Sequence, residues 1–216
     1  MITAGVGVEK ARRGLNGHIV LAKYLEHGVV VEGHVDFGNG LHGNVFINPH
    51  ALFRDWSEIW QDIQTMWEKL PTTLARDIQV VAGPLTGGAF IALWSPIVLD
   101  QLHAPADPRI QFAMIEMENG NAKMKPTYAD VVKGKKVALV DDVRNTGRTF
   151  HTCAQAITKA GGELVVTLCL IDRKQVRPEF SLDVSHVSLT VYDVEDRLVP
   201  QDKCVDCQFG VPIMKF

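Results

Sequence analysis

Residues 136–150 read KVALVDDVRNTGRTF and contain the pattern that decides the fold. An apolar run leads into two adjacent acids and a Thr-Gly turn, after which Phe150, Cys153, Ala154 and Ile157 recur at the spacing of one helix face. A buried strand followed at once by a helix is typical of a crossover unit in a parallel sheet. Ligands bind such sheets beside the carboxyl ends of the strands, so the acids and the turn stand where a site is expected.

The same alternation of apolar, strand-like runs and helical patterns continues on both sides of this stretch. Strands are expected at 78–83, 110–115, 135–140 and 163–171, with helices beginning at Gly87 and Thr149. The apolar runs lack the polar alternation of a half-exposed strand, as expected where helices cover both faces of a sheet. We therefore expect an α/β fold with a doubly wound, mainly parallel sheet and helices on both faces. Pro96 is expected to kink the first of these helices or to end it early.

The α/β core is expected to occupy residues 75–195. Residues 1–74 are expected to form N-terminal helices and a small hood segment, and residues 196–216 a C-terminal tail. Stretch 33–50 is rich in Gly and Asn, which predicts turns or a hairpin rather than packed core.

Two helices are expected in the N-terminal segment. The apolar positions in 18–26 predict a short helix that Gly28 closes. Apolar residues at three- and four-residue steps predict an amphipathic helix at 53–70, stopped by Pro71. The aromatic side of this helix is expected to lie in the core.

Composition limits the classes of protein that the chain can represent. It has 216 residues, 46% of them hydrophobic and 22% charged, which is typical of a globular protein. The formal net charge of -3 provides no broad positive surface for a nucleic acid. No stretch has the roughly 20 consecutive apolar residues of a membrane span, and the N-terminal residues lack a signal-peptide pattern. A cytoplasmic protein without a nucleic-acid or membrane partner is expected.

The acids and the turn have a chemical use as well as a structural one. Asp141 and Asp142 can accept hydrogen bonds from a sugar diol or bind a divalent cation. The loop from Arg144 to Thr149 supplies backbone N–H groups, hydroxyls and a helix N-terminus, which together suit a phosphate monoester. Read separately, acids can cap a strand and Thr-Gly can turn a chain. The ordered combination favours a ligand site, because a turn alone needs neither paired acids nor two hydroxyls.

At these residues the sequence resembles the type I phosphoribosyltransferases. Their motif for phosphoribosyl diphosphate has four apolar residues, two acids, two variable residues and a Thr-Gly-x-Thr-like loop. The resemblance implies the type I phosphoribosyltransferase fold, and it implies that Asp141 and Asp142 hold the ribose hydroxyls. It further implies that the 5-phosphate is held by the loop of Asn145, Thr146, Gly147, Arg148 and Thr149.

A second loop extends this resemblance. Residues 83–88 read GPLTGG between a predicted strand and a predicted helix, where glycine lets the backbone approach an anion closely. This loop resembles the family's pyrophosphate loop, which implies that Gly87 and Gly88 hold pyrophosphate, and Gly-Pro-x-x-Gly-Gly specifically resembles orotate phosphoribosyltransferases.

Two further stretches point to the same subfamily. The segment around Gly33, His34, Gly40, Phe46 and Asn48 is similar to the N-terminal segment of orotate phosphoribosyltransferases. The resemblance implies that the Phe46 segment contacts the base. IDRK at 171–174 resembles the family's strand-end Asp-Arg, which implies that Arg173 binds the carboxylate of orotate. Without the resemblance, Arg173 could equally be a solvated arginine at a strand end.

The chain also departs from the family pattern. Gly38 and Asn39 stand where a lysine and a serine are usual. The stretch at 114–134 corresponds to a mobile loop that is rich in Arg, Lys and His in the family, but it has only Lys123 and Lys125 ahead of its last residues. If this loop closes over pyrophosphate, these two lysines are the candidate catalytic cations. Binding of phosphoribosyl diphosphate is better supported than fast catalysis on orotate.

The expected function follows from the resemblance. It implies transfer of ribose 5-phosphate from phosphoribosyl diphosphate to a nucleobase, with orotate favoured, with release of pyrophosphate, with Mg²⁺ and in a homodimer. A purine-base phosphoribosyltransferase is one alternative. Another is a regulator that senses phosphoribosyl diphosphate and binds nucleic acid, although the negative net charge and the lack of a helix-turn-helix pattern count against it.

Cys204 and Cys207 form a single CxxC pair near the C-terminus. Structural zinc takes four ligands, and the sequence has no second CxxC and no His pair at ligand spacing. Two ordinary thiols are therefore expected, with no metal ligand among the eight histidines.

Overall fold

The computed structural model describes residues 17–37, 40–103, 109–195 and 198–215. The two family departures at Gly38 and Asn39 lie outside the described residues. Within the described ranges, no helix is both long enough and apolar enough to cross a membrane.

The centre of the molecule is a six-stranded sheet in the order β5-β4-β3-β6-β7-β8. Its strands are β3 (Val80–Pro84), β4 (Gln111–Glu118), β5 (Asn121–Lys123), β6 (Lys136–Arg144), β7 (Glu163–Asp172) and β8 (Ser185–Val191). All neighbours pair in parallel except the edge strand β5, which is antiparallel to β4. The four strands expected from the sequence and the mainly parallel sheet are confirmed.

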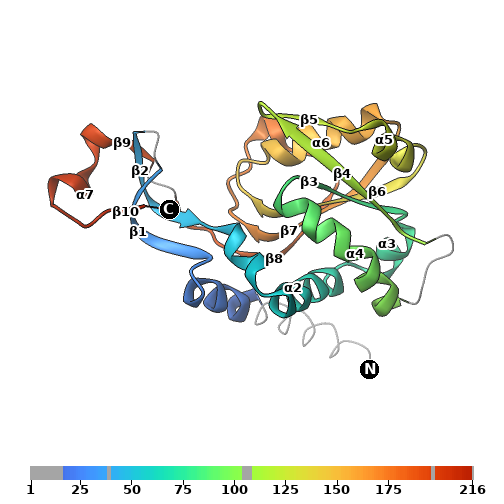
Figure 1. Cartoon of the computed structure of the whole chain (residues 1–216), viewed down its shortest axis with the longest axis horizontal. Coiled ribbons are helices and arrows are strands. Elements are labelled where there is room, and N and C mark those ends of the chain that lie inside the picture. The colour runs from blue at the N-terminus through green and yellow to red at the C-terminus, as the bar shows by residue number, and fades with distance from the viewer. Residues whose placement is uncertain (1–16, 38–39, 104–108, 196–197, 216) are drawn as a thin grey trace, which may run out of the picture.

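Helices cover both faces of this sheet, as expected (Figure 1). One face packs against α2 (Trp56–Glu68) and α4 (Gly87–His103), with α3 (Thr72–Asp77) nearby. The other face packs against α5 (Pro126–Val132) and α6 (Arg148–Lys159). The strands alternate between these two cores: Val81 of β3 faces the first and Val80 faces the second. Burial on both faces explains why the strands read as continuous apolar runs.

Helix α2 begins later than the apolar pattern suggested. Asp55 caps it by accepting hydrogen bonds from the backbone N–H groups of Ser57 and Glu58, and a 3-10 helix, η1 (Pro49–Arg54), precedes it. The expectation that its whole aromatic side is core is wrong, because Trp67 is buried but Trp56 is 68% exposed. Trp56 is the first residue of α2.

Pro96 does not end α4, contrary to the expectation of an early end. The helix runs on to His103 with the proline inside it. Trp67 of α2 donates a hydrogen bond from Nε1 to Ser95 Oγ at 2.9 Å, so α2 is anchored to α4 one residue before the proline. Tertiary packing here outweighs the local preference of proline.

A second, smaller sheet has the order β10-β1-β2-β9 and joins the two ends of the described chain. The expected hairpin is present as β1 (Val30–Asp36) and β2 (Leu41–Ile47), preceded by helical residues 17–26 and by Gly28 at φ 68°. Strands β9 (Val199–Pro200) and β10 (Met214–Lys215) come from the C-terminal tail.

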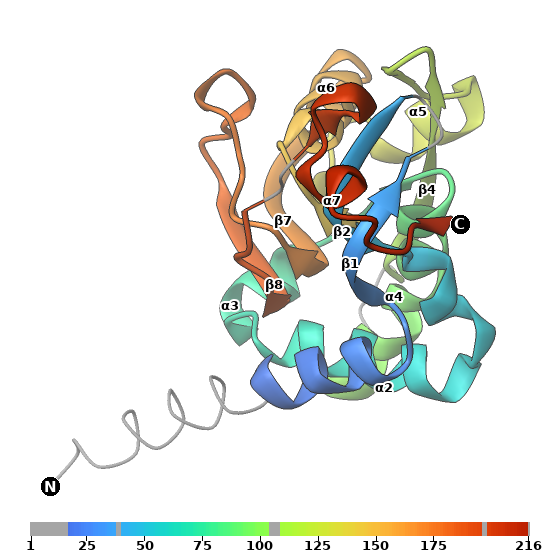
Figure 2. The ribbon, with the colours of Figure 1, turned by 90° about the vertical axis from the view of Figure 1, so that its left-hand side faces the viewer.

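The tail carries further short elements and lies against the hairpin. Between its strands are η3 (Gln201–Lys203) and α7 (Val205–Gln208), and η2 (Pro178–Phe180) precedes β8 in the core. In Figure 2 the red tail runs along the blue hairpin. The predicted hood segment and the predicted tail thus form one sheet, which we call the hood sheet.

Candidate active site

The two predicted phosphate loops meet at the centre of the six-stranded sheet. Strand β3 pairs with β4 on one side and with β6 on the other. The strands that follow β3 are therefore added first on one side of it and then on the other, so the strand order switches between β3 and β6, which are parallel. Open α/β sheets bind ligands at such a switch point. The loop after β3 carries Gly87 and Gly88, and the end of β6 carries Asp141 and Asp142.

The loop after β3 packs directly on the two acids. A Cβ atom at Gly87 would overlap the Asp142 carboxylate, and one at Gly88 would lie 2.9 Å from Asp141 Oδ1 and 2.7 Å from the Val140 carbonyl oxygen. At position 88 the overlap involves the backbone, so only glycine fits there, whereas at position 87 the Asp142 side chain would have to move to admit a Cβ atom. The peptide bond between Leu85 and Thr86 in this loop is cis. The sequence placed these residues in two separate motifs, and the structure brings them into contact.

Burial and mutual repulsion make the acidic pair costly to ionise. Burial, followed by the charge of Asp142, raises the pKa of Asp141 well above its ordinary value, and Asp141 is only 8% exposed. Burial also raises the pKa of Asp142, although the Val143 N–H and the charge of His50 oppose this shift. Hydroxyl donors or a cation would relieve both effects, so the pair suits a sugar diol or a metal-bound ligand.

The loop predicted to bind the 5-phosphate leads into α6 through Gly147, which has φ 84°. Gly147 is the N-cap residue of α6 and no side chain caps the helix there, so the first-turn N–H groups of Arg148 and Thr149 have no capping acceptor. A Cβ atom at position 147 would lie 3.1 Å from Val176 Cγ1. The Thr146 carbonyl accepts a hydrogen bond from Arg177 N, which holds this loop against the segment that follows β7. The helix N-terminus is therefore shaped for an anion.

The stretch expected as a mobile loop forms a hairpin and a helix in this structure. Strands β4 and β5 turn at Asn119 and Gly120, both with positive φ, and α5 follows. The turn lies near α6, because a Cβ atom at Gly120 would be 3.3 Å from Arg148 Nη2. Of the two predicted catalytic lysines, Lys123 lies on the edge strand β5 and Lys125 is the N-cap residue of α5.

Glu116 faces both of these lysines. Lys125 Nζ forms an ion pair with Glu116 Oε1 at 2.8 Å, and this partner raises the pKa of Lys125. Lys123 lies opposite Glu116 in the ladder between β4 and β5. In this arrangement the acid offsets part of the positive charge that was expected to meet pyrophosphate.

Arg173 is buried, with 3% of its surface exposed, and is not a solvated strand-end arginine. Its guanidinium donates from Nε to the Tyr192 carbonyl oxygen at 3.2 Å and from Nη2 to the Val194 carbonyl oxygen at 2.9 Å. It also stacks 5.1 Å from the Tyr192 ring centroid. Arg173 thus joins the end of β7 to the segment that follows β8.

The neighbouring Asp172 pairs with a residue of the β6 end. Arg144 donates from Nε and Nη2 to its two carboxylate oxygens, at 3.3 and 2.7 Å. Burial would raise the pKa of Asp172, but hydrogen bonds from Arg144 and from Lys174 N outweigh it and hold the pKa below its ordinary value. This bidentate pair fixes the ends of β6 and β7 side by side.

Phe46, the predicted base contact, lies on β2 of the hood sheet and not on the central sheet. Its ring packs edge to face with Phe37 at 6.2 Å between centroids. The hood sheet is tied to the core through Glu32 of β1, which accepts a hydrogen bond from the Tyr192 hydroxyl. Tyr192 is the residue that stacks on Arg173, so the hood and the Arg173 region are structurally linked.

A search with family models matches residues 53–195 to the phosphoribosyl transferase domain. The match covers two thirds of the chain and includes both glycine loops and the acidic pair. The chain belongs to this family. It is accordingly a pentosyltransferase of the type I phosphoribosyltransferase group.

Relatives of this phosphoribosyltransferase include several proteins named orotate phosphoribosyltransferase. The one from Maricaulis maris is 26% identical over 186 residues, which cover 84% of this chain and 90% of that protein. The one from Brucella anthropi is 25% identical over 201 residues, which cover 93% and 97%. The crystal structure of orotate phosphoribosyltransferase from Aeropyrum pernix has TM-score 0.61 and 22% identity, covering 80% of this chain and 93% of that one.

One residue that influences the acidic pair of this phosphoribosyltransferase was not indicated by the sequence. His50, on η1 immediately after the hood hairpin, is close enough for its charge to lower the pKa of Asp142. A lone histidine in a Gly- and Asn-rich stretch has no recognisable spacing to an acid 92 positions further on. Only the tertiary structure brings His50 near enough to Asp142 for this effect on its pKa.

Proposed function

We propose that this phosphoribosyltransferase transfers ribose 5-phosphate from phosphoribosyl diphosphate to orotate and releases pyrophosphate. The observation that carries the proposal is the contact between the Gly87-Gly88 loop and the Asp141-Asp142 pair, next to the uncapped N-terminus of α6. Two anion sites that flank a diol site suit a ribose with phosphates at both ends. The names of the relatives at 25 to 26% identity support orotate as the base.

In this proposal each group has a separate role. Asp141 and Asp142 accept hydrogen bonds from the ribose hydroxyls. Burial raises the pKa of both carboxyls, so hydrogen-bond donors would stabilise their charged forms. The loop from Asn145 to Thr149 holds the 5-phosphate with backbone N–H groups and hydroxyls. The backbone of Gly87 and Gly88 holds pyrophosphate.

The residues present also fit Mg²⁺, which the family resemblance implies. The cation would lie near the Asp141 and Asp142 carboxylates, which are oxygen ligands of the kind that it prefers and whose repulsion it would reduce. When bound with phosphoribosyl diphosphate, Mg²⁺ neutralises charge on the pyrophosphate leaving group. The chain's own part is to hold the ribose carbon in line between pyrophosphate and base while positive charge develops on the sugar.

The base would be held from the hood side. Arg173 is the proposed contact for the orotate carboxylate, and its link through Tyr192 to Glu32 places it beside the hood sheet that carries Phe46. The relatives' similarity supports the hood's part in the site, because the match to the Brucella anthropi protein covers 93% of the chain and extends well beyond the family domain at 53–195.

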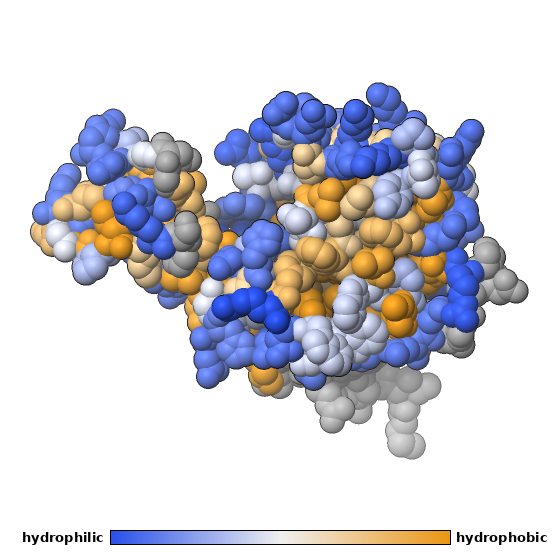
Figure 3. Space-filling model, in the orientation of Figure 1, coloured by the Kyte–Doolittle hydropathy of each residue, from blue (hydrophilic) through white to orange (hydrophobic). Residues whose placement is uncertain are grey.

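We also propose that the protein works as a homodimer. Helices α2 and α4 expose an apolar surface that includes Phe90, Leu93 and Ile97 of α4 at 48%, 50% and 55% exposure, and Trp56 of α2. Figure 3 shows orange surface gathered over these helices. A contiguous exposed apolar surface of this kind marks an association site, and a second copy is the partner that the family resemblance implies.

The deciding experiment is a pyrophosphate-release assay with phosphoribosyl diphosphate, Mg²⁺ and a panel of bases: orotate, uracil, adenine, guanine and hypoxanthine. We expect release with orotate only. Release with a purine base instead would reject the orotate assignment while keeping the transferase. No release with any base, combined with tight binding of phosphoribosyl diphosphate, would favour a regulator over an enzyme.

A further inference from the structure

Four metal-ligating side chains converge in the hood sheet, away from the acidic pair. His34, His42, Cys204 and Cys207 place one ligand atom each within 4.8 Å of all the others. Three of them are almost completely buried, with exposures of 2% for His34, 1% for His42 and 4% for Cys204, and Cys207 is partly buried. No residue of the proposed transferase site belongs to this cluster.

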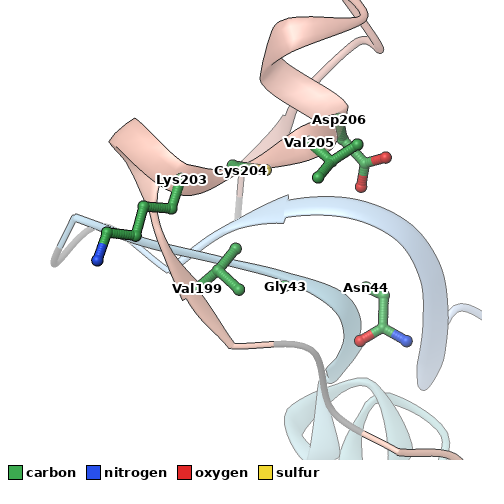
Figure 4. A pocket seen from close by; sticks show the side chains of 7 residues that line it. All are labelled: Gly43, Asn44, Val199, Lys203, Cys204, Val205 and Asp206. Carbon is green, nitrogen blue, oxygen red and sulfur yellow. The ribbon is translucent and has the colours of Figure 1, made fainter.

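The cluster joins distant parts of the chain. His34 lies on β1 and His42 on β2, where the hairpin register places position 42 opposite Asp36. Cys204 precedes α7 and Cys207 lies within it. In Figure 4 the segment that carries Cys204 lies over the strands of the hairpin. The expectation of two ordinary thiols rested on the lack of partners at ligand spacing, and the fold supplies these partners.

Four of the six distances between the ligand atoms are close to those of a tetrahedral metal site. Tetrahedral zinc with Zn–S bonds of about 2.3 Å and Zn–N bonds of about 2.0 Å separates its ligand atoms by about 3.3 to 3.8 Å. Here Cys204 Sγ and Cys207 Sγ lie 3.4 and 3.6 Å from His34 Nε2, and Cys207 Sγ lies 3.2 Å from His42 Nδ1. The two nitrogens, 2.9 Å apart, need to separate by only a few tenths of an ångström.

The surroundings aim both imidazoles at the centre of the cluster. His34 Nδ1 lies 2.9 Å from the Val211 carbonyl oxygen, an acceptor that requires a proton on Nδ1 and so leaves the Nε2 lone pair facing the thiols. His42 Nε2 lies 4.0 Å from Asp36 Oδ1, with Nδ1 turned into the cluster. Metal-binding histidines characteristically present their other nitrogen to a carbonyl or a carboxylate in this way.

We propose that His34, His42, Cys204 and Cys207 bind one structural zinc ion per chain. Four protein ligands close the coordination sphere, which distinguishes a structural site from a catalytic one that keeps a position for water. On binding, each thiol loses its proton to solvent and forms a Zn–S bond, and each neutral imidazole forms a Zn–N bond. Two thiolates balance the charge of Zn²⁺, so the buried site is neutral overall.

The zinc would hold the C-terminal tail on the hood sheet. The tail pairs through strands of only two residues each, β9 and β10, and α7 has four residues. Its apolar side chains contribute little, because Leu198, Val205 and Phe209 are 53%, 57% and 81% exposed. A segment with so little burial and so few ladder bonds needs another attachment, and metal coordination is a common one in small structures.

A pocket beside the cluster gives the ion a route from solvent. It is lined by Gly43, Asn44, Val199, Lys203, Cys204, Val205 and Asp206 (Figure 4). Cys204 is shared by the pocket and the cluster, and Gly43 directly follows His42. The partly exposed Cys207 offers a second approach.

The test is the metal content of the full-length protein, purified under reducing conditions without chelators and measured by inductively coupled plasma mass spectrometry. We expect about one zinc per chain. Cys207→Ser and His42→Ala should each lose the bound zinc. Cys153→Ala, which removes a buried cysteine of the central core, and His27→Gln, which removes an exposed histidine, should both retain it.

Two further measurements on the wild-type protein test for the zinc site even if a ligand variant folds poorly. Wild-type apoprotein titrated with Co²⁺ should give the visible bands of a tetrahedral site and a thiolate charge-transfer band, saturating at one equivalent. Apoprotein should also be cut by trypsin after the exposed Lys203 faster than zinc-loaded protein, while the six-stranded core stays intact. Zinc-free wild-type protein that shows no such cobalt spectrum would overturn the proposal, as would a Cys204–Cys207 disulfide in the reduced preparation. Neither result would affect the transferase assignment.

Discussion

Gly87 lies against Asp142 so closely that a Cβ atom at position 87 would overlap the carboxylate. The contact places the proposed pyrophosphate loop directly against the Asp142 side chain of the proposed ribose site. The restriction at position 87 comes from the Asp142 side chain on the neighbouring strand. The backbone conformation does not demand glycine, because Gly87 is the first residue of the helix α4 and has no positive φ.

Gly87→Ala should therefore abolish binding of phosphoribosyl diphosphate, because the added Cβ atom displaces the Asp142 carboxylate or pushes the loop away from β6. A ligand that binds only the native state stabilises it by about 2.7 kcal/mol at a hundredfold excess over Kd. We expect wild-type protein to show the corresponding rise in Tm with phosphoribosyl diphosphate and Mg²⁺, and Gly87→Ala to show none. Gly17→Ala is the matched control, since its Cβ would meet only the Leu189 carbonyl oxygen at an ordinary 3.6 Å. A normal Tm rise in Gly87→Ala would contradict the assignment.

Asp141→Asn should stabilise the ligand-free protein while removing the ligand response. The folded-state pKa of Asp141 is raised, so the folded protein binds more protons than the unfolded chain and loses stability as the pH rises from the unfolded pKa of about 3.9 toward the folded value. The variant lacks this loss, so its Tm should exceed that of wild type at about pH 7 and approach it at about pH 3.

Thermal melts of Asp141→Asn at both pH values, with and without phosphoribosyl diphosphate and Mg²⁺, test this expectation. Asp183→Asn, which alters an exposed carboxylate, should change neither measurement. A variant that melts lower than wild type at neutral pH would show that the Asp141 charge stabilises the fold. An undiminished ligand response would remove the diol assignment.

Replacement of both Lys123 and Lys125 by alanine should lower kcat far more than it weakens ligand binding. Loss of a charge that stabilises a departing group commonly costs a factor of about 100 or more in turnover. Glu116→Gln removes the partner of Lys125 and should leave kcat unchanged or raise it. Steady-state kinetics compare the three proteins. Wild-type kcat in the double variant would end the catalytic role of both lysines.

Arg173→Ala should raise the KM for orotate and leave the KM for phosphoribosyl diphosphate nearly unchanged. Because the guanidinium also bonds to the Tyr192 and Val194 carbonyls, the variant should melt at a lower temperature as well. Arg144→Ala, which breaks the neighbouring pair with Asp172, is the matched control for stability. If Arg173→Ala loses stability but keeps the wild-type KM for orotate, the residue is structural and the base lacks a carboxylate contact there.

Charges placed on the exposed face of α4 should dissociate the proposed homodimer. Leu93→Glu and Ile97→Glu each bring a carboxylate into the apolar surface, where its desolvation would oppose association. Light scattering after size-exclusion chromatography should give a dimer for wild type and a monomer for each variant. Gln155→Glu adds the same charge to an exposed position of α6, on the opposite face of the central sheet, and should stay dimeric. A monomeric wild type would reject the homodimer.

Much of the central sheet could be predicted because its cause is local. The apolar runs that became β3, β4, β6 and β7 are buried on both faces, so each strand carries its signal in a few consecutive residues. The acids and glycines at strand ends were recognisable because they also form short patterns of consecutive residues. Pro96 shows the limit of local rules, since packing around Ser95 and Trp67 keeps α4 continuous through it.

The sequence by itself determined the alternating α/β order, the two glycine-containing loops at strand ends and the acidic pair, because these depend on neighbours within about ten positions. Only the tertiary structure decided which side chains meet. It buries Arg173 against main-chain carbonyls and pairs Lys125 with Glu116. It also brings His34 and His42 to Cys204 and Cys207, about 170 positions further along the chain. The sequence contained a predicted hairpin with two histidines and a CxxC pair, but spacing along a chain cannot reveal a contact that exists only when a C-terminal tail folds back onto an N-terminal sheet.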